Sequence, residues 1–179
     1  MKKNKNLLIT GAATRVGKAI ALHFARKGWN IALHYFTSST KAKKLKKIIE
    51  QNSVKVILIK ADLKNANQVK KIIPLAKKQL GTIDCLVNNA ALFEKDDIYN
   101  FTNKSWYDHI NINLFAPAIL TQQFAKQVSK KEISNIIISN GYIHLIGSDA
   151  HNCSKRNFCI KDAYDFIEKK ISKELISFL

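Results

Sequence analysis

The sequence has few cysteines, few prolines and glycines, and no long apolar run. Its three cysteines, Cys85, Cys153 and Cys159, are few and odd in number, which is typical of a reduced, cytoplasmic protein. Only a few apolar residues follow the basic start MKKNKN before a glycine. We therefore expect neither a secretory signal nor a membrane-spanning segment. No repeat or Pro/Gly-rich linker divides the 179 residues, a length that suits one domain.

Acidic residues and arginine are also scarce. The 13 acidic residues stand against 30 basic ones, giving a formal net charge of +17, yet only Arg15, Arg26 and Arg156 are arginines. Recognition of nucleic acid favours arginine clustered on one face, whereas these lysines are spread over nearly every expected helix. We expect a solvated lysine surface that adheres weakly to polyanions, and no specific nucleic-acid partner. A basic polyanion-binding module remains an alternative.

Apolar runs alternate with amphipathic stretches through the first 139 residues. The apolar runs predict strands at 6–10, 30–35, 54–62, 83–90 and 134–139. The amphipathic stretches predict helices at 15–28, 39–52, 67–81 and 104–130, with a kink at Pro74 in the third. This alternation indicates an α/β fold with a doubly wound parallel sheet of five or six strands, the sixth being the segment YIHLI at 142–146.

A glycine-bearing turn follows the first predicted strand. In the stretch ITGAATRVG, Gly11 directly follows the strand and Gly17 falls in the first turn of the next helix. Glycine permits a tight turn and the close approach of a ligand, and the helix N-terminus offers free amide donors. We therefore predict that this turn binds an anion, such as a pyrophosphate.

The second predicted strand ends without an acid. Dinucleotide folds that prefer NAD usually carry an acid there, for the ribose 2′-hydroxyl. Here the strand is followed by Thr37, Ser38 and Ser39. Arg15 lies in the glycine-bearing turn of residues 11–17, called the phosphate turn below. Because an arginine and hydroxyl groups hold a 2′-phosphate that a carboxylate would repel, NADP(H) is favoured over NAD(H). The alternative is that Arg15 is only a surface residue.

Four ordered motifs resemble those of the short-chain dehydrogenase/reductase family. TGAATRVG is similar to the family's TGxxxGxG turn, with arginine for the middle glycine, and ADL (61–63), NNAA (88–91) and NINLFAP (111–117) are similar to its later motifs. The resemblance covers residues 5–140. It implies a Rossmann-like fold and an oxidoreductase that acts on a small-molecule substrate. It does not decide whether the protein forms oligomers. The cofactor-binding residues that it implies are Gly11, Arg15, Val16, Gly17, Ser38, Asp62, Leu63, Asn89 and Ala90.

Within that family the chain looks most like the pteridine reductases. The arginine variant of the turn, LHY on the second strand and Phe93 after NNAA carry this likeness. It implies NADPH as hydride donor and a pterin or dihydrofolate-like substrate, with Phe93 stacked on the pterin ring. Asn113 would be the asparagine that holds the proton-relay water and the catalytic lysine. The alternatives are an apolar plug under a loop for Phe93, and a helix-kink or capping residue for Asn113.

The catalytic residues of the family are missing from the expected positions. Gly141 stands where a serine or aspartate would align, and no Tyr-x-x-x-Lys follows: Ile146 lies four residues after Tyr142, and Glu168 four after Tyr164. That lysine would lower the pKa of the tyrosine. We therefore expect an NADP-binding domain at 1–140 and an atypical tail at 141–179 with one helix. A truncated or fused relative without turnover is the alternative to an active reductase.

The tail resembles the C-terminal end of the PHP family of metal-dependent phosphoesterases. The resemblance rests on GYIHLIGSDAHN and the amphipathic stretch that follows, and implies Asp149 and His151 as metal ligands, with Cys153 near them. A catalytic metal needs at least three protein ligands, and the chain has no His-x-His pair. We expect no metal, and a polar loop before a helix.

Overall fold

The fold is organised around a parallel sheet of five strands. The computed structural model describes residues 4–94, 99–127 and the backbone of 135–138. The strands are β1 (Asn6–Ile9), β2 (Asn30–Tyr35), β3 (Val56–Lys60), β4 (Cys85–Asn88) and β5 (Asn135–Ile138), in the order β3-β2-β1-β4-β5. Every neighbouring pair is parallel, with Leu8 beside Ala32 and Leu86. The predicted doubly wound, Rossmann-like sheet is therefore confirmed, while a sixth strand at 142–146 would lie outside the described residues.

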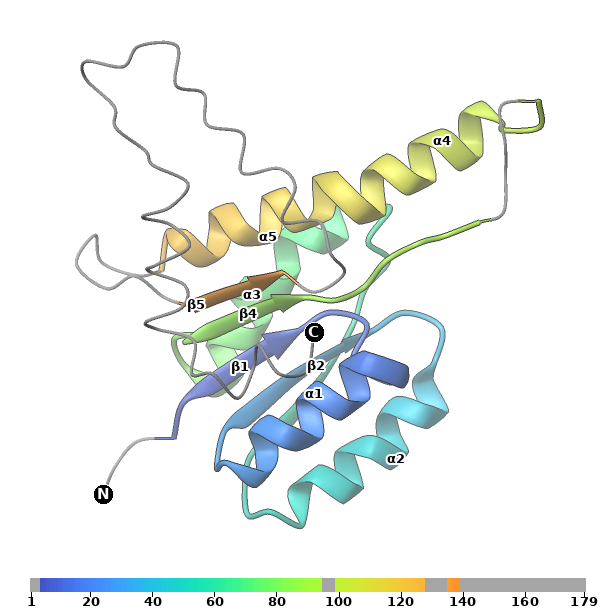
Figure 1. Cartoon of the computed structure of the whole chain (residues 1–179). Helices are drawn as coiled ribbons and strands as arrows, with labels where there is room; N and C mark the ends of the chain where they lie inside the picture. Colours follow the sequence, from blue (N-terminus) through green and yellow to red (C-terminus); the bar gives the residue numbers. More distant parts are fainter. Residues whose placement is uncertain (1–3, 95–98, 128–134, 139–179) are drawn as a thin grey trace, which may run out of the picture. The chain divides into compact units, whose positions relative to one another are not determined.

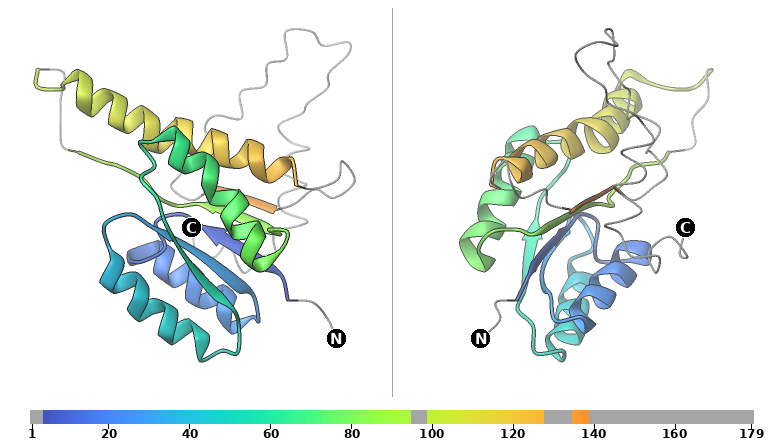
Figure 2. Two further views of the ribbon diagram at one scale, coloured as in Figure 1. Left: turned by 180° about the vertical axis from the view of Figure 1, so that it is seen from behind. Right: turned by 60° about the vertical axis from the view of Figure 1, so that its left-hand side comes forward.

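Helices cover both faces of the sheet (Figures 1 and 2). Helices α1 (Arg15–Arg26) and α2 (Ser39–Glu50) pack on one face, where Leu7 and Ile9 are buried against them. On the other face Leu8 lies in a second core with α3 (Ala66–Leu80) and α5 (Ala116–Ala125). Successive strand residues thus feed two cores, as a sheet buried on both faces requires.

The predicted elements agree with the observed ones except at their ends and in one helix. The long helix predicted at 104–130 is observed as a contiguous helical run that ends five residues earlier, and it consists of α4 (Asn103–Ile110), the π-helical segment η1 (Asn111–Phe115) and α5. The amide of Ala116 donates to Asn111, five residues back. Pro117 explains the irregularity, because proline has no N–H for the carbonyl of Asn113 four residues earlier.

A proline inside α3 is accommodated by a neighbouring helix. Pro74 lies within the helix and cannot donate to the carbonyl of Lys70. The side chain of Gln123 on α5 donates to that carbonyl instead, with Nε2 and O 2.9 Å apart. The helix therefore continues through the proline, and α5 supplies the hydrogen bond that α3 lacks.

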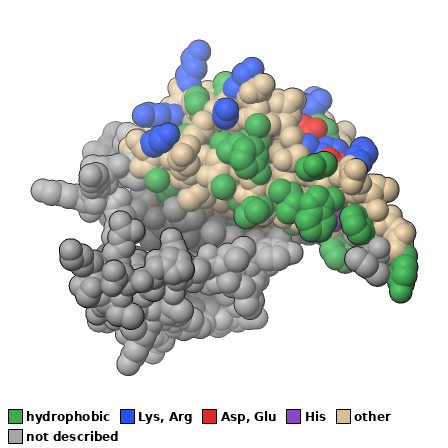
Figure 3. Space-filling view, turned by 90° about the horizontal axis from the view of Figure 1, so that it is seen from above, with side chains coloured by type: hydrophobic (Ala, Val, Ile, Leu, Met, Phe, Trp, Pro, Cys, Tyr) green, Lys and Arg blue, Asp and Glu red, His purple; other side chains and the backbone are tan. Residues whose placement is uncertain are grey.

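Exposed apolar side chains gather on α4 and η1 (Figure 3). The exposed large residues there are Trp106, Tyr107, Ile110, Leu114 and Phe115. Within the described part of the chain, no helix is both long and apolar enough to cross a bilayer.

The Gln123–Lys70 hydrogen bond predicts a coupling between Gln123 and Pro74. We expect Gln123→Leu to lower the free energy of unfolding by about 1 kcal/mol, because it leaves the Lys70 carbonyl without its donor. In a Pro74→Ala background the new amide of residue 74 can bond that carbonyl, so the same change should cost less. Urea denaturation of the four proteins of this double-mutant cycle measures the coupling. Exposed Gln122→Leu is the matched control, and equal costs in both backgrounds would contradict the prediction.

Candidate cofactor-binding site

The turn from β1 to α1 requires glycine at two positions. Gly11 has a left-handed backbone with φ of 62°, and a Cβ atom there would lie 2.9 Å from the Cα of Ala90. At Gly17 a Cβ would lie 2.5 Å from the carbonyl oxygen of Gly11 and 2.6 Å from Nδ2 of Asn89. The helix start, the turn and the residues after β4 therefore touch at backbone distance, which only glycine allows.

Thr10 joins the turn to the segment that follows β4. Its buried hydroxyl accepts hydrogen bonds from the amides of Asn89 and Ala90, both at 3.0 Å. In return, Nδ2 of Asn89 donates to the carbonyls of Thr10 at 2.9 Å and Gly11 at 3.2 Å. Two of the predicted cofactor residues thus hold the phosphate turn in place.

His34 of β2 holds the turn from the opposite side. The amide of Gly11 donates to Nδ1 at 3.2 Å, and Nε2 lies 3.1 Å from the carbonyl oxygen of Ala61, directly after β3. Burial lowers the pKa of His34 to about 4, although the hydrogen bond to Ala61 opposes this. The imidazole is therefore neutral at physiological pH.

Arg15 occupies a strained position at the first residue of α1. Its φ of 47° lies in the left-handed region, which non-glycine residues rarely adopt. Arg15 and Val16 are exposed there, and the first turn of α1 contains no acidic residue. After the neighbouring strand β2, Ser38 is the N-cap residue of α2 but makes no capping hydrogen bond with its side chain. A cation and a hydroxyl therefore lie at the same edge of the sheet, where the carboxyl ends of β1 and β2 meet.

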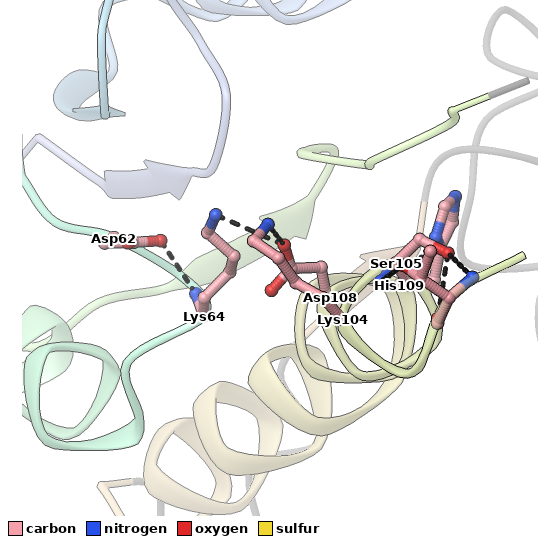
Figure 4. Close-up of polar contacts among 7 residues, drawn as sticks. Asp62, Lys64, Lys104, Ser105, Asp108 and His109 are labelled. Atoms are coloured by element: carbon pink, nitrogen blue, oxygen red, sulfur yellow. Dashed lines mark hydrogen bonds and ion pairs between the residues drawn. The ribbon is translucent and has the colours of Figure 1, made fainter.

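The segment after β3 is tied to α4 (Figure 4). Asp62 Oδ1 accepts from the amide of Lys64, and Leu63 is buried. The ammonium of Lys64 lies 3.4 Å from Oδ2 of Asp108 on α4, and Lys104 lies 2.8 Å from the same oxygen. The hydrogen bond from Lys104 lowers the pKa of Asp108, with Lys64 adding to the effect. This ion-pair group links the loop that carries Asp62 to α4.

Two side chains of the α4–η1 helix hold the loop after β4. Asn113 accepts from the amide of Leu92 and donates to its carbonyl, both at 2.8 Å. The amide of Glu94 donates to Nε2 of His109, whose Nδ1 lies 2.7 Å from the carbonyl oxygen of Ser105 (Figure 4). Phe93 lies between these two anchored residues with 90% of its surface exposed. The loop thus presents an aromatic ring from a held backbone.

The described residues contain neither a reactive thiol nor a candidate metal site. Burial raises the pKa of the Cys85 thiol to about 12, with Asp84 adding to the shift, so the thiol stays protonated. Among the described residues, no group of three His, Cys, Asp or Glu side chains is placed to hold a metal ion. Asp149, His151 and Cys153 lie outside the described residues, as do Gly141, Tyr142 and Tyr164.

The structure brings most of the predicted site residues to one edge of the sheet. Gly11, Gly17, Asn89 and Ala90 are in mutual contact, whereas Asn113 contacts the loop that bears Phe93. The roles of Thr10 and His34 were not predicted from the sequence. The available signal was a polar residue within, or directly after, an otherwise apolar strand. Their partners, which come from other strands, were not evident from the sequence.

A glycine turn at the carboxyl end of β1, beside the end of β4, is typical of dinucleotide-binding α/β proteins. The family model for short chain dehydrogenases matches residues 5–156, and the chain belongs to that family. It is 30% identical over 148 residues to the 3-oxoacyl-(acyl-carrier-protein) reductase FabG of Staphylococcus aureus, covering 83% of this chain and 60% of that one. The chain thus spans about 60% of the length of the curated relatives it matches.

Solved structures share the fold. FolM alternative dihydrofolate reductase 1 from Brucella canis, complexed with NADP, matches with a TM-score of 0.71 and 28% identity, over 76% of this chain and 55% of that one. A short chain dehydrogenase from Burkholderia cenocepacia, also in complex with NADP, matches with a TM-score of 0.72 and 26% identity, over 77% and 56%.

The Thr10 hydroxyl predicts a stability difference between two substitutions. Thr10→Val preserves the shape of the side chain but leaves the amides of Asn89 and Ala90 without an acceptor. We expect it to lower the free energy of unfolding by about 2–3 kcal/mol, whereas Thr10→Ser, which retains the hydroxyl, should cost about 1 kcal/mol or less. Urea denaturation measures both, and equal stabilities of the two variants would contradict this role.

Burial of neutral His34 predicts a loss of stability in acid. The unfolded chain takes up a proton on this residue near pH 6.5, whereas the folded protein does so only near pH 4. Because the unfolded state binds more protons between these values, the free energy of unfolding should fall by about 3 kcal/mol as the pH drops from 6.5 to 4. Comparison of wild type with His34→Asn by denaturation at several pH values isolates this contribution. Identical pH slopes would refute it.

Proposed function

We propose that this chain binds NADP(H) and forms the cofactor-binding part of an oxidoreductase that transfers hydride to a small carbonyl or imine substrate. The observation that carries the proposal is the turn from β1 to α1, in which Gly11 and Gly17 leave no room for a side chain. A pyrophosphate fits this turn, because a helix N-terminus attracts anions. Two of the solved relatives carry NADP.

The preference for a 2′-phosphate rests on charge. Residues 36–39 after β2 contain no acid, and Arg15 stands exposed across the same edge of the sheet. Asp62 and Leu63 would contact the adenine, and Asn89 and Ala90, which touch Gly11 and Gly17, would lie beside the phosphate turn. Arg15 holds its strained backbone at a helix N-terminus, where a cation is unfavourable, and such strain is typical of functional positions.

We further propose a pterin or a similar flat ring as the substrate. Phe93 supports this choice, because it offers an exposed aromatic face from a backbone that Asn113 and His109 anchor on either side. Flat rings stack on such faces. One solved relative is an alternative dihydrofolate reductase, whereas the FabG relatives are 3-oxoacyl-(acyl-carrier-protein) reductases. Asn113 would act in this reaction as a positioning residue, through Leu92.

A second candidate is a cofactor-binding relative without turnover. None of the five tyrosines in the sequence is followed four positions later by lysine. Without a neighbouring cation, a tyrosine retains its ordinary pKa near 10 and is a poor acid–base catalyst at neutral pH. This candidate retains the cofactor site and differs only in activity.

We also propose a cytoplasmic protein that self-associates. The exposed apolar side chains of α4 and η1, including Trp106 and Leu114, support the association, because apolar surface of this kind is stabilised when buried.

Substitutions at Arg15 test the cofactor proposal. We expect Arg15→Ala and Arg15→Gly both to weaken NADPH binding by about tenfold or more, because each removes the cation, and to change NADH binding less. Only glycine relieves the left-handed strain, so Arg15→Gly should also stabilise the fold by about 1 kcal/mol. Fluorescence titration and thermal denaturation measure the two effects.

The matched control is Ser53→Gly. Ser53 has a similar strained backbone, with φ of 57°, in the turn after α2. Its replacement should stabilise the protein without changing NADPH affinity. If wild-type protein fails to bind NADPH at millimolar concentration, the cofactor proposal is wrong.

Turnover separates the two candidates. An active reductase should oxidise NADPH when dihydrobiopterin is added, and Phe93→Ala should raise the KM for it more than Phe93→Tyr does, because tyrosine retains the aromatic face. Absorbance at the NADPH band follows the reaction. Background rates with saturable NADPH binding would instead support the candidate without turnover.

A further inference from the structure

His34 lies on β2 beside the proposed cofactor site, but the sequence did not predict it as a cofactor contact. It is 2% exposed and sits on β2, between β1 and β3. Its two ring nitrogens contact main-chain groups of different neighbours: Nδ1 the amide of Gly11, and Nε2 the carbonyl of Ala61. One ring therefore joins segments that follow two separate strands.

The contacts determine the protonation of the ring. The amide of Gly11 can only donate, so Nδ1 must be the unprotonated acceptor. The carbonyl of Ala61 can only accept, so Nε2 must carry the proton. Neither the imidazolium ion nor the other neutral tautomer satisfies both contacts, since each would set an N–H against the Gly11 amide. A lowered pKa of about 4, caused by burial, agrees with the neutral ring.

The two contacts of His34 reach both parts of the site. Gly11 begins the phosphate turn, and its carbonyl is held by Asn89 while its amide is held by His34. Ala61 directly precedes Asp62, the residue assigned to the adenine. A shift of the ring would therefore change the spacing between the phosphate and adenine subsites.

We propose that His34 is a positioning residue for the dinucleotide: as the neutral Nε2–H tautomer, it sets the distance between the phosphate turn and the adenine-binding segment. This inference rests on the proposed function. The residue does not contact the cofactor itself, and its effect on binding is transmitted through Gly11 and Ala61.

Two substitutions separate the two contacts. Asparagine places an oxygen near the position of Nδ1, so His34→Asn retains an acceptor for Gly11 and loses the donor to Ala61. Glutamine places an NH₂ group near the position of Nε2, so His34→Gln retains that donor and loses the acceptor for Gly11. Exposed His23 on α1 provides the matched control, His23→Gln.

The first experiment uses the wild-type protein without cofactor. Nitrogen-15 NMR at neutral pH should show a His34 ring protonated at Nε2 only. Amide hydrogen exchange should show protection of Gly11 in wild type and His34→Asn, and its loss in His34→Gln. A ring protonated at Nδ1, or a Gly11 amide whose exchange does not depend on residue 34, would overturn the inference.

The second experiment measures NADPH affinity well below the melting temperature of each variant. We expect His34→Gln to weaken binding by about tenfold, His34→Asn by less, and His23→Gln not at all. A His34→Gln protein that is less stable but binds NADPH as tightly as wild type would make the residue purely structural. That outcome overturns this inference and leaves the proposed function standing. A wild-type protein that shows the expected tautomer but does not bind NADPH overturns the proposed function and the positioning role, while confirming the contacts of the ring.

Discussion

The peptide groups around Gly11 are held by side chains from two different strands, and the phosphate turn depends on this constraint. β1 lies between β2 and β4, so His34 reaches the amide of Gly11 from one side and Asn89 reaches its carbonyl from the other. The hydroxyl of Thr10 in turn accepts hydrogen bonds from the amides of Asn89 and Ala90, directly after β4. Glycine adopts many backbone conformations in an unfolded chain, and these side chains hold Gly11 in the left-handed one.

Side-chain amides perform a related task in the helical layer. Gln123 replaces the donor that Pro74 lacks, which keeps α3 continuous beneath the sheet. Asn113 lies in the π-helical segment η1, and its side chain hydrogen-bonds both the amide and the carbonyl of Leu92. In each case a main-chain group outside regular helix hydrogen bonding finds a side-chain partner on another element, and the pair at Leu92 is half-buried. The loop bearing Phe93 is ordered by the second of these pairings.

The basic residues differ in their surroundings. Most lysines of the described residues lie on solvent-facing helix positions, and Lys104 pairs with Asp108 on α4. Arg15 differs, because its backbone is strained and its charge lies at a helix N-terminus. Both features are unfavourable to the stability of the fold, and the proposed binding of an anionic cofactor accounts for them.

The sequence by itself determined the α/β class, the strands and most helix ends to within about two residues, and the position of the glycine turn between β1 and α1. These depend on local patterns: apolar periodicity, caps, and glycine where a strand meets a helix. The division at residue 140 and the metal resemblance of the tail remain predictions. Only the tertiary structure decided the roles of Thr10, His34, Asn113 and Gln123. Each depends on a hydrogen-bond partner on another strand, helix or loop, and the order and register of the strands, which no local pattern encodes, bring those partners together.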